Sequence, residues 1–548
     1  MTTAATRAIE MTNPGNDIQN QIMWNRLIAI VEEQAQTLLR TAFSPIVREA
    51  GDLSAGVFDC QGRMLAQAVT GTPGHVNSMA ESVKHFISHF GVDAMKPGDA
   101  YITNDPWLGT GHLNDFVVTT PCFYHGKLIG LFSCTSHLID IGGIGFGPEA
   151  TDVFMEGLYI PMLPLIQEGK VNQTLIEMIR ANTRLPVDTV GDTYALVSCN
   201  EVGCERLEQM MAEFKLTDLN DLGNFICDRS EAAVRAEIAK LPNGSWTNTM
   251  VTDGYDEPVE LTATVTISDD TMHVDFSGSS LVCSKGINVP MAYTTAYTVF
   301  GLSCIVASQI PKNAGSLKPL TVSAPQGTIV NAPKPAPVCS RHVIGQMLPD
   351  VVFGCLHQAI PDRVPAEGCS CLWNLNVRGR LKSDEGGADG CSMAFTANGG
   401  TGARPESDGL SATAYPSGVK GTPVEIAEQI TPLIFWRKQF RPGSGGGGKT
   451  RGGLGQEIEV QSRIGASFEL LAAYDRIDHP ARGRDGGQAG SAGSVRLRSG
   501  VTLKGKGFLT VPAGDRLIVH TPGGGGLGDP AQRDAARIAK DKESGLIN

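Results

Sequence analysis

The sequence lacks the features that mark several large classes of protein. Aromatic residues make up only 6% of the 548 residues, the net charge is −12, and no dense block of Lys and Arg occurs. Nucleic acid is therefore not an expected partner, because its phosphates require clustered basic side chains. No apolar run reaches the roughly 18 residues that cross a bilayer. The first twenty residues lack a basic stretch followed by an apolar one. We therefore expect a cytoplasmic protein without a membrane segment.

The sequence also lacks a cysteine framework. Its 13 cysteines are an odd number in a long chain, and none forms a C-x-x-C pair. Cys369 and Cys371 are two residues apart, which is not the spacing of a zinc finger. Free thiols in a reducing compartment are therefore expected.

Apolar periodicity predicts an α+β fold. A helical stripe covers residues 18–39, a second helix is expected at about 76–90 with Gly91 after it, and helices dominate 173–239. Beyond Pro242 the pattern becomes β-rich, with a hairpin expected over 259–276, and many of the 65 glycines lie there. We therefore predict three regions, namely a helical and mixed N-terminal region (1–240), a β-rich middle domain (241–375) and a Gly-rich C-terminal region (376–548). That last region ends in a short charged helix at 531–542, which is expected to fray.

A β-hairpin is expected in the N-terminal region, because apolar runs 116–123 and 127–135 flank the turn His125-Gly126. Regular pairing around this turn sets Asn114 opposite His137 and Asp115 opposite Ser136. Residues two apart on a strand share a face, so His112 and His137 would be diagonal neighbours about 7–8 Å apart at Cα.

This hairpin is a candidate metal site, since two histidines and a carboxylate suit Zn, Mn or Fe. In a regular strand Asp115 points to the other face, so it joins only if the chain bulges, which the Gly109-Thr-Gly111 sequence favours. Histidines on a hairpin are more often plain polar residues than ligands, so spacing alone leaves both interpretations open. Four nearby carboxylates are candidates to complete the metal shell, orient a ligand or act as general base: Glu49, Asp52, Asp105 and Asp140.

Other polar residues carry weaker signals. Residues 443–450 match the phosphate-binding pattern GxxxxGK[ST], but Gly452 and Gly453 follow where that loop requires a helix. We therefore predict a hairpin-type loop without a nucleotide role. Arg341, His342 and His357 lie among apolar residues and are interpreted as structural, whereas His75 is either a site residue or a packing residue.

Several motifs in order resemble the hydantoinase B/oxoprolinase family over nearly the whole chain. They are Asn104-Asp-Pro106, Gly111-His-Leu-Asn-Asp115, Ser136-His-Leu-Ile-Asp-Ile-Gly-Gly143, Phe276-Ser-Gly-Ser-Ser280, Gly286-Ile-Asn-Val-Pro290, Asn313-Ala-Gly315, Gly399-Gly-Thr-Gly-Ala-Arg404 and Pro522-Gly-Gly-Gly-Gly-Leu-Gly-Asp-Pro530. The resemblance implies a hydantoinase A-type partner of actin-like fold, in an α2β2 heterotetramer, that binds ATP and phosphorylates a carbonyl oxygen. Related ketone carboxylases hold manganese with a His-x-x-Asp pair and a later His. These ligands match His112, Asp115 and His137 and, on a weaker match, Glu49.

The resemblance thus implies the metal-carrying subunit (Zn or Mn) of an ATP-dependent hydrolase that opens a hydantoin, oxoproline or lactam ring. Two alternatives stay open, namely a subunit of an acetone or aromatic ketone carboxylase and a scaffold for the A-type partner. Chain length favours the hydrolase, since carboxylase chains of this type tend to be longer. A scaffold has no need of the metal-site residues.

Overall fold

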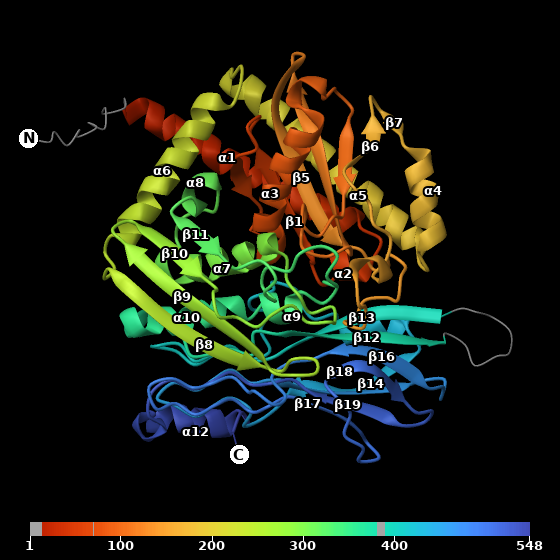
Figure 1. Cartoon of the computed structure of the whole chain (residues 1–548), viewed down its shortest axis with the longest axis vertical. Helices are drawn as coiled ribbons and strands as arrows, with labels where there is room; N and C mark the ends of the chain where they lie inside the picture. The colour runs from red at the N-terminus through yellow and green to blue at the C-terminus, as the bar shows by residue number, and fades with distance from the viewer. Residues whose placement is uncertain (1–13, 70, 381–389, 548) are drawn as a thin grey trace, which may run out of the picture.

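The structure, a computed structural model, describes residues 14–69, 71–380 and 390–547. Figure 1 shows the N-terminal region at the top, the middle β-sheet at the left and the C-terminal sheets below. The mixed helix and sheet composition confirms the predicted α+β class. Among the described residues, no helix is both long enough and apolar enough to span a membrane.

The N-terminal region is built on an antiparallel sheet of seven strands in the order β2-β1-β5-β4-β3-β6-β7. Helices α1 and α5 pack on strands β1, β2, β4 and β5, and α3 packs on β1, β4 and β5 and against α7. The elements are α1 (Pro14–Thr41), α2 (Pro45–Arg48), β1 (Leu53–Phe58), β2 (Met64–Gln67), α3 (Pro73–Phe90), β3 (Ala100–Thr103), β4 (Asp115–Tyr124), β5 (Lys127–His137), β6 (Leu163–Gln167), β7 (Lys170–Val171), α4 (Gln173–Asn182), α5 (Pro186–Phe214) and α6 (Asn220–Ile238).

The helices of this region confirm the elements predicted from apolar periodicity. Helix α1 covers the predicted stripe, and α3 is followed by the capping residue Gly91, whose φ of 77° is one that glycine adopts without strain. Helices α4 to α6 fill the stretch predicted to be helical, and α5 is capped by Lys215 in the left-handed conformation.

The middle region holds the sheet β11-β10-β9-β8, in which β10 and β11 are parallel and the other pairs antiparallel. Strands β9 and β10 form the predicted hairpin, with Asp269 at φ 53° in its turn. Helix α10 packs on β8 and β9, and α7 contacts β11. The elements are β8 (Gly244–Thr252), β9 (Val259–Ser268), β10 (Thr271–Asp275), α7 (Met291–Val306), α8 (Ala314–Leu317), β11 (Leu320–Ser323), α9 (His342–Gly345) and α10 (Leu348–Ala359).

The C-terminal region consists of two four-stranded sheets, β13-β12-β16-β18 and β14-β15-β19-β17. Strand β12 crosses the expected boundary at 375/376, and one apolar core runs on from Val234 to Val519. The elements are β12 (Leu372–Arg380), β13 (Gly390–Asn398), α11 (Val424–Ile430), β14 (Leu433–Phe440), β15 (Gln456–Ser462), β16 (Phe468–Ala473), β17 (Ser494–Leu497), β18 (Lys506–Val511), β19 (Arg516–His520) and α12 (Ala535–Glu543).

The glycine-rich stretch at 443–455 connects the antiparallel strands β14 and β15, as the hairpin-type prediction required. After Thr450 the chain runs on into β15 without forming a helix, in the place where a phosphate-binding loop needs one. Glycine segments pack backbone against backbone here. A Cβ on Gly524, for example, would lie 1.9 Å from the carbonyl oxygen of Thr401.

The short terminal helix predicted at 531–542 forms as α12 and is anchored by ion pairs. Helix α12 is held by Asp541, which is only 6% exposed and lies 3.2 Å from Arg451 Nε and 2.6 Å from Arg533 Nη2. A buried carboxylate between two guanidinium groups fixes the helix against the Gly-rich layer.

Candidate metal centre

The β4–β5 hairpin has a register that differs by one residue from the predicted one. The turn at His125 and Gly126 was predicted correctly, and Phe123 pairs with Leu128 as expected. A β-bulge then leaves Ile129 unpaired, so that Cys122 lies opposite Gly130 and the shift persists to the end of the strands. Asp115 therefore pairs with His137, and the predicted pairs Asn114–His137 and Asp115–Ser136 were wrong.

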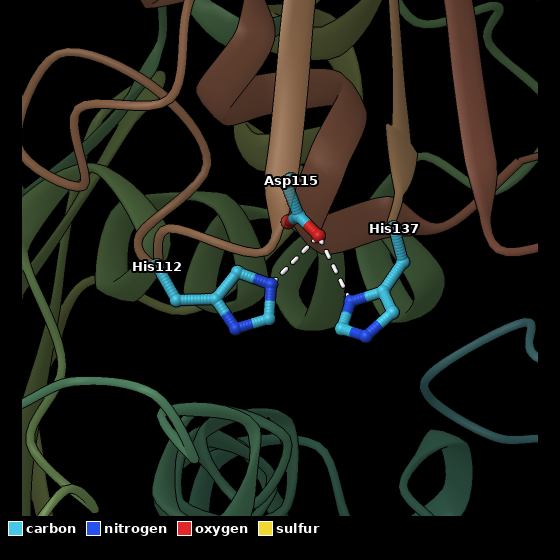
Figure 2. A group of neighbouring side chains, drawn as sticks. All are labelled: His112, Asp115 and His137. Carbon is cyan, nitrogen blue, oxygen red and sulfur yellow. Dashed lines mark hydrogen bonds and ion pairs between the residues drawn. The ribbon is translucent and has the colours of Figure 1, made fainter. Parts of the chain in front are cut away.

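This bulge brings Asp115 and His137 to the same face of the sheet, because directly opposed residues share a face. It lies near the turn and not at Gly109–Gly111, where the sequence favoured it. His112 is in the loop before β4, so its expected strand position was also wrong. Figure 2 nevertheless shows all three side chains converging at the ends of the two strands.

The three candidate ligands form a buried cluster. Asp115 Oδ1 lies 2.6 Å from His112 Nε2 and 3.1 Å from His137 Nδ1, and the two imidazole centroids are 5.1 Å apart. Ligand atoms bound to one ion at ~2.1 Å stand about 3 Å from one another. The separations therefore fit donors on a shared cation.

The second oxygen of Asp115 is held by other side chains. Its Oδ2 accepts a hydrogen bond from Arg341 Nη2 at 2.6 Å and lies 2.9 Å from His75 Nε2. Burial opposes ionisation of Asp115, but His112, His75 and Arg341 outweigh it and hold the pKa of the carboxyl well below its usual value. Asp115 is thus ionised, with Oδ1 directed at the histidines and Oδ2 fixed from behind.

His112 is held in one tautomer. Its Nδ1 is 2.8 Å from the carbonyl oxygen of Cys339, which can only accept, so Nδ1 carries the proton. Burial and the charge of Arg341 lower the pKa of His112 to about 3, so the ring is neutral and Nε2 presents a lone pair. That lone pair faces the carboxylate oxygen at 2.6 Å, a repulsive contact that an ion bound by both atoms would relieve. The donor set therefore fits a divalent metal ion.

The loop that orients His112 is itself anchored by Glu156. Its Oε1 accepts hydrogen bonds from the backbone N–H groups of Val338 (2.6 Å) and Cys339 (2.8 Å), while Oε2 is buried without a partner among the described residues. Burial raises the pKa of Glu156 to about 8 against the effect of these two bonds. A protonated Glu156 thus positions the carbonyl group that selects the His112 tautomer.

Among the four predicted carboxylates, Asp52 is the one that lines the same cavity as His112 and His137. Its Oδ1 accepts a hydrogen bond from Thr72 Oγ1 at 3.0 Å and lies 3.5 Å from His75 Nδ1. His75 in turn contacts Asp115. Burial opposes protonation of His75, but Asp115 and Asp52 outweigh it and raise its pKa.

The structure places Asp140 at a neighbouring cavity, where its Oδ1 is 2.7 Å from Arg184 Nη1. Asp105 accepts hydrogen bonds from the backbone N–H of Trp107 and from the hydroxyl of Tyr159.

Glu49 lies at the end of α2 and pairs with Arg48 at 2.9 Å. Neither Asp105 nor Glu49 is among the residues that line these two cavities. The structure therefore does not bring all four carboxylates together.

Several residues of the cavity were not predicted from the sequence. Arg341 and His342, interpreted as structural, line it together with Tyr293, and Phe146 packs its ring against His112 and His137. His75, for which both interpretations were left open, also lines it. Arg341 Nε also donates to the carbonyl oxygen of Thr110 at 2.7 Å. The sequence signal that could have identified Arg341 and His342 as site residues is the occurrence of an Arg-His pair in an otherwise apolar stretch. His357, by contrast, is hydrogen-bonded to Asp485.

Fold and site together define an α+β protein with an interior cluster of two histidines and one carboxylate suited to a metal ion. The chain belongs to the hydantoinase B/oxoprolinase family, whose model matches residues 16–530.

It is 27% identical over 559 residues to the B-type subunit of a putative D-/L-hydantoinase from a Pseudomonas species, covering 96% of this chain and 92% of that protein. The crystal structure of an ATP-dependent caprolactamase from Pseudomonas jessenii superimposes with a TM-score of 0.88 at 26% identity, covering 98% of this chain and 95% of that one. Acetone carboxylase shares the fold, with a TM-score of 0.82 at 19% identity over 98% of this chain and 79% of that one.

Proposed function

We propose that this chain is the metal-carrying subunit of an ATP-dependent enzyme that opens a hydantoin, oxoproline or lactam ring. The observation that carries the proposal is the buried His112–Asp115–His137 cluster, whose neutral His112 and ionised Asp115 face each other as ligands of a cation do. The names of the relatives support the cyclic amide and the need for ATP.

The partner is a hydantoinase A-type subunit that binds ATP, in an α2β2 assembly. An amide carbonyl is a poor electrophile, and phosphorylation of its oxygen converts that atom into a leaving group. A bound Zn or Mn ion would supply Lewis acidity toward the carbonyl oxygen and toward water.

The chain's own residues have separate roles in this proposal. His112, Asp115 and His137 hold the ion, while Arg341 and His75 orient Asp115 from behind.

Asp52 is the best-placed general base, because it lines the cavity and lies next to His75. Asp140 stays a candidate at the neighbouring cavity. Glu49 and Asp105 are weaker candidates, because their oxygens are engaged with Arg48 and with Tyr159 and Trp107.

The test combines this chain with its A-type partner and follows ATP-dependent turnover of hydantoin, 5-oxoproline and caprolactam. We expect turnover of one of these rings, a stoichiometric divalent metal in this chain, and loss of both metal and turnover in His137→Ala. A chain that contains no metal, with His137→Ala fully active, would refute the proposal.

The carboxylase alternative is supported by the shared fold with acetone carboxylase. Labelled bicarbonate separates the two reactions, because ring opening incorporates no carbon. Label in the product together with intact rings would establish the carboxylase reaction in place of the hydrolase.

A further inference from the structure

Strand β12 carries a polar stripe that leads away from the metal centre. Every second residue of the strand belongs to it, so these side chains lie on one face: Leu372, Asn374, Asn376 and Arg378. The first two line the cavity of His112 and His137, and the last two line the neighbouring cavity. In Figure 1, β12 lies in the upper layer of the C-terminal sheets, on the side of the N-terminal region.

The two cavities adjoin each other. Three residues line both cavities, namely Ile46, His137 and Phe146, so the His137 side chain borders each of them. Both are open to solvent, and only the innermost part of each is so narrow that it holds no more than a water molecule or two. A ligand held by the β12 stripe would therefore lie directly beside the metal centre.

Two amide side chains on the stripe have an unused acceptor. Asn374 and Asn376 are each 9% exposed, and the Oδ1 atom of each is buried without a hydrogen-bond partner in the part of the chain that the structure describes. The orientation of Asn376 is settled by its Nδ2, which donates to the carbonyl oxygens of Phe146 (2.9 Å) and Leu471 (3.4 Å). A buried acceptor without a partner is costly, and a ligand N–H group would satisfy it.

Arg378 is a half-buried cation at the outer end of the stripe. Its Nη2 donates to the carbonyl oxygen of Ile144 at 2.6 Å, and Gly145 lets the guanidinium pack on the loop because any side chain there would collide with it. Among the described residues, no carboxylate lies within ion-pair distance of Arg378. Asp140 is engaged with Arg184, and Glu469, the β16 residue opposite Arg378, is exposed.

We propose that the β12 stripe is a substrate subsite in which Arg378 binds an oxyanion group and the Asn374 and Asn376 carbonyl oxygens accept from ring N–H groups. The oxyanion is either a carboxylate on the cyclic amide or the phosphoryl group added by the partner subunit, and a guanidinium binds both in the same way. This inference rests on the proposed function, because it places the substrate of that reaction next to His137.

The first test measures binding to the full chain, loaded with metal, by calorimetry. The probes are inorganic phosphate, 5-oxoproline and 2-pyrrolidinone, the last being the same ring without the carboxylate. We expect Arg378→Gln to weaken binding of phosphate or 5-oxoproline by about 10- to 100-fold, as loss of a charge-assisted hydrogen bond does, and to leave 2-pyrrolidinone unchanged. Arg378→Lys should retain part of the affinity. Arg437→Gln, which removes an exposed arginine on β14, is the matched control.

The pattern of losses identifies the source of the oxyanion. A loss confined to phosphate indicates the phosphoryl group, and a loss confined to 5-oxoproline indicates the carboxylate. Equal affinities in wild type and Arg378→Gln, or losses as large in Arg437→Gln, would overturn the proposal. Folding of each variant is checked by thermal unfolding, and Asn376→Asp gives a second variant, whose added negative charge should weaken anion binding at least as much.

Turnover with the partner subunit separates this inference from the proposed function. If wild type opens a cyclic amide with ATP while Arg378→Gln keeps the same KM and kcat, the subsite is wrong and the proposed function stands. If wild type opens no ring at all but the anion binding depends on Arg378, the proposed function fails, while Arg378 remains the residue that binds the anion.

Discussion

Replacing Asp115 by Asn tests the metal centre most directly, because it removes one charge and almost no volume. Asp115 is fully buried and contacts His112, His137, His75 and Arg341. Without its carboxylate, the buried guanidinium of Arg341 has lost its counter-ion. Removing one partner of a buried ion pair costs about 3–5 kcal/mol. We therefore expect the free energy of unfolding of the metal-free chain to fall by that amount.

The same substitution should abolish stabilisation by metal. A divalent ion at a free concentration 100 times its dissociation constant stabilises the folded state by about 2.7 kcal/mol. Chemical denaturation with and without Mn²⁺ or Zn²⁺, and with a chelator, measures this difference. Wild type should gain stability on metal addition, and Asp115→Asn should gain none.

Asp218→Asn is the control, since Asp218 forms a surface ion pair with Lys127 at 2.9 Å. Such a pair contributes about 0–1 kcal/mol, and its loss should leave the response to metal unchanged. If the chelator leaves wild type unchanged, or if Asp115→Asn still binds one metal ion per chain, the cluster is a structural ion-pair network and the reasoning fails.

Three further predictions concern other parts of the chain. Glu156 has a folded-state pKa of about 8, above its unfolded value near 4.5, so the stability it contributes is complete below pH 4.5 and is lost as the pH rises toward 8. The free energy of unfolding of wild type should therefore fall by up to about 5 kcal/mol relative to that of Glu156→Gln over this pH range. A difference between the two proteins that does not change with pH would contradict this prediction. Calorimetry should detect no ATP binding to the isolated chain, and Lys449→Ala should behave as wild type; binding abolished by this variant would restore the phosphate-loop interpretation. Gly524→Ala should lower the thermal unfolding temperature markedly because its Cβ would overlap the Thr401 carbonyl, whereas Gly421→Ala, at an exposed site where a Cβ meets no atom closer than 3.5 Å, should not.

The elements with strong periodicity were predictable from the sequence. Helices α1 and α3, the β9–β10 hairpin and the connection between β14 and β15 all follow from local patterns of apolar residues and glycines. The ordered anchoring of α12 was not predictable, because Asp541 is held by Arg451, 90 positions away in the sequence. Local pattern carries no information about such a distant partner.

Sequence by itself determined the family, the α+β class and three candidate ligands, because short motifs and apolar periodicity can be recognised without knowing which distant residues are in contact. Tertiary structure decided how these ligands meet. A bulge at Ile129 moves the register by one residue, and because side chains alternate, this step carries Asp115 to the face of His137. Folding also brings His75 from α3 and Arg341 from the loop before α9 to the second oxygen of Asp115. These contacts join residues up to 226 positions apart, which only the packing of separate regions can bring together.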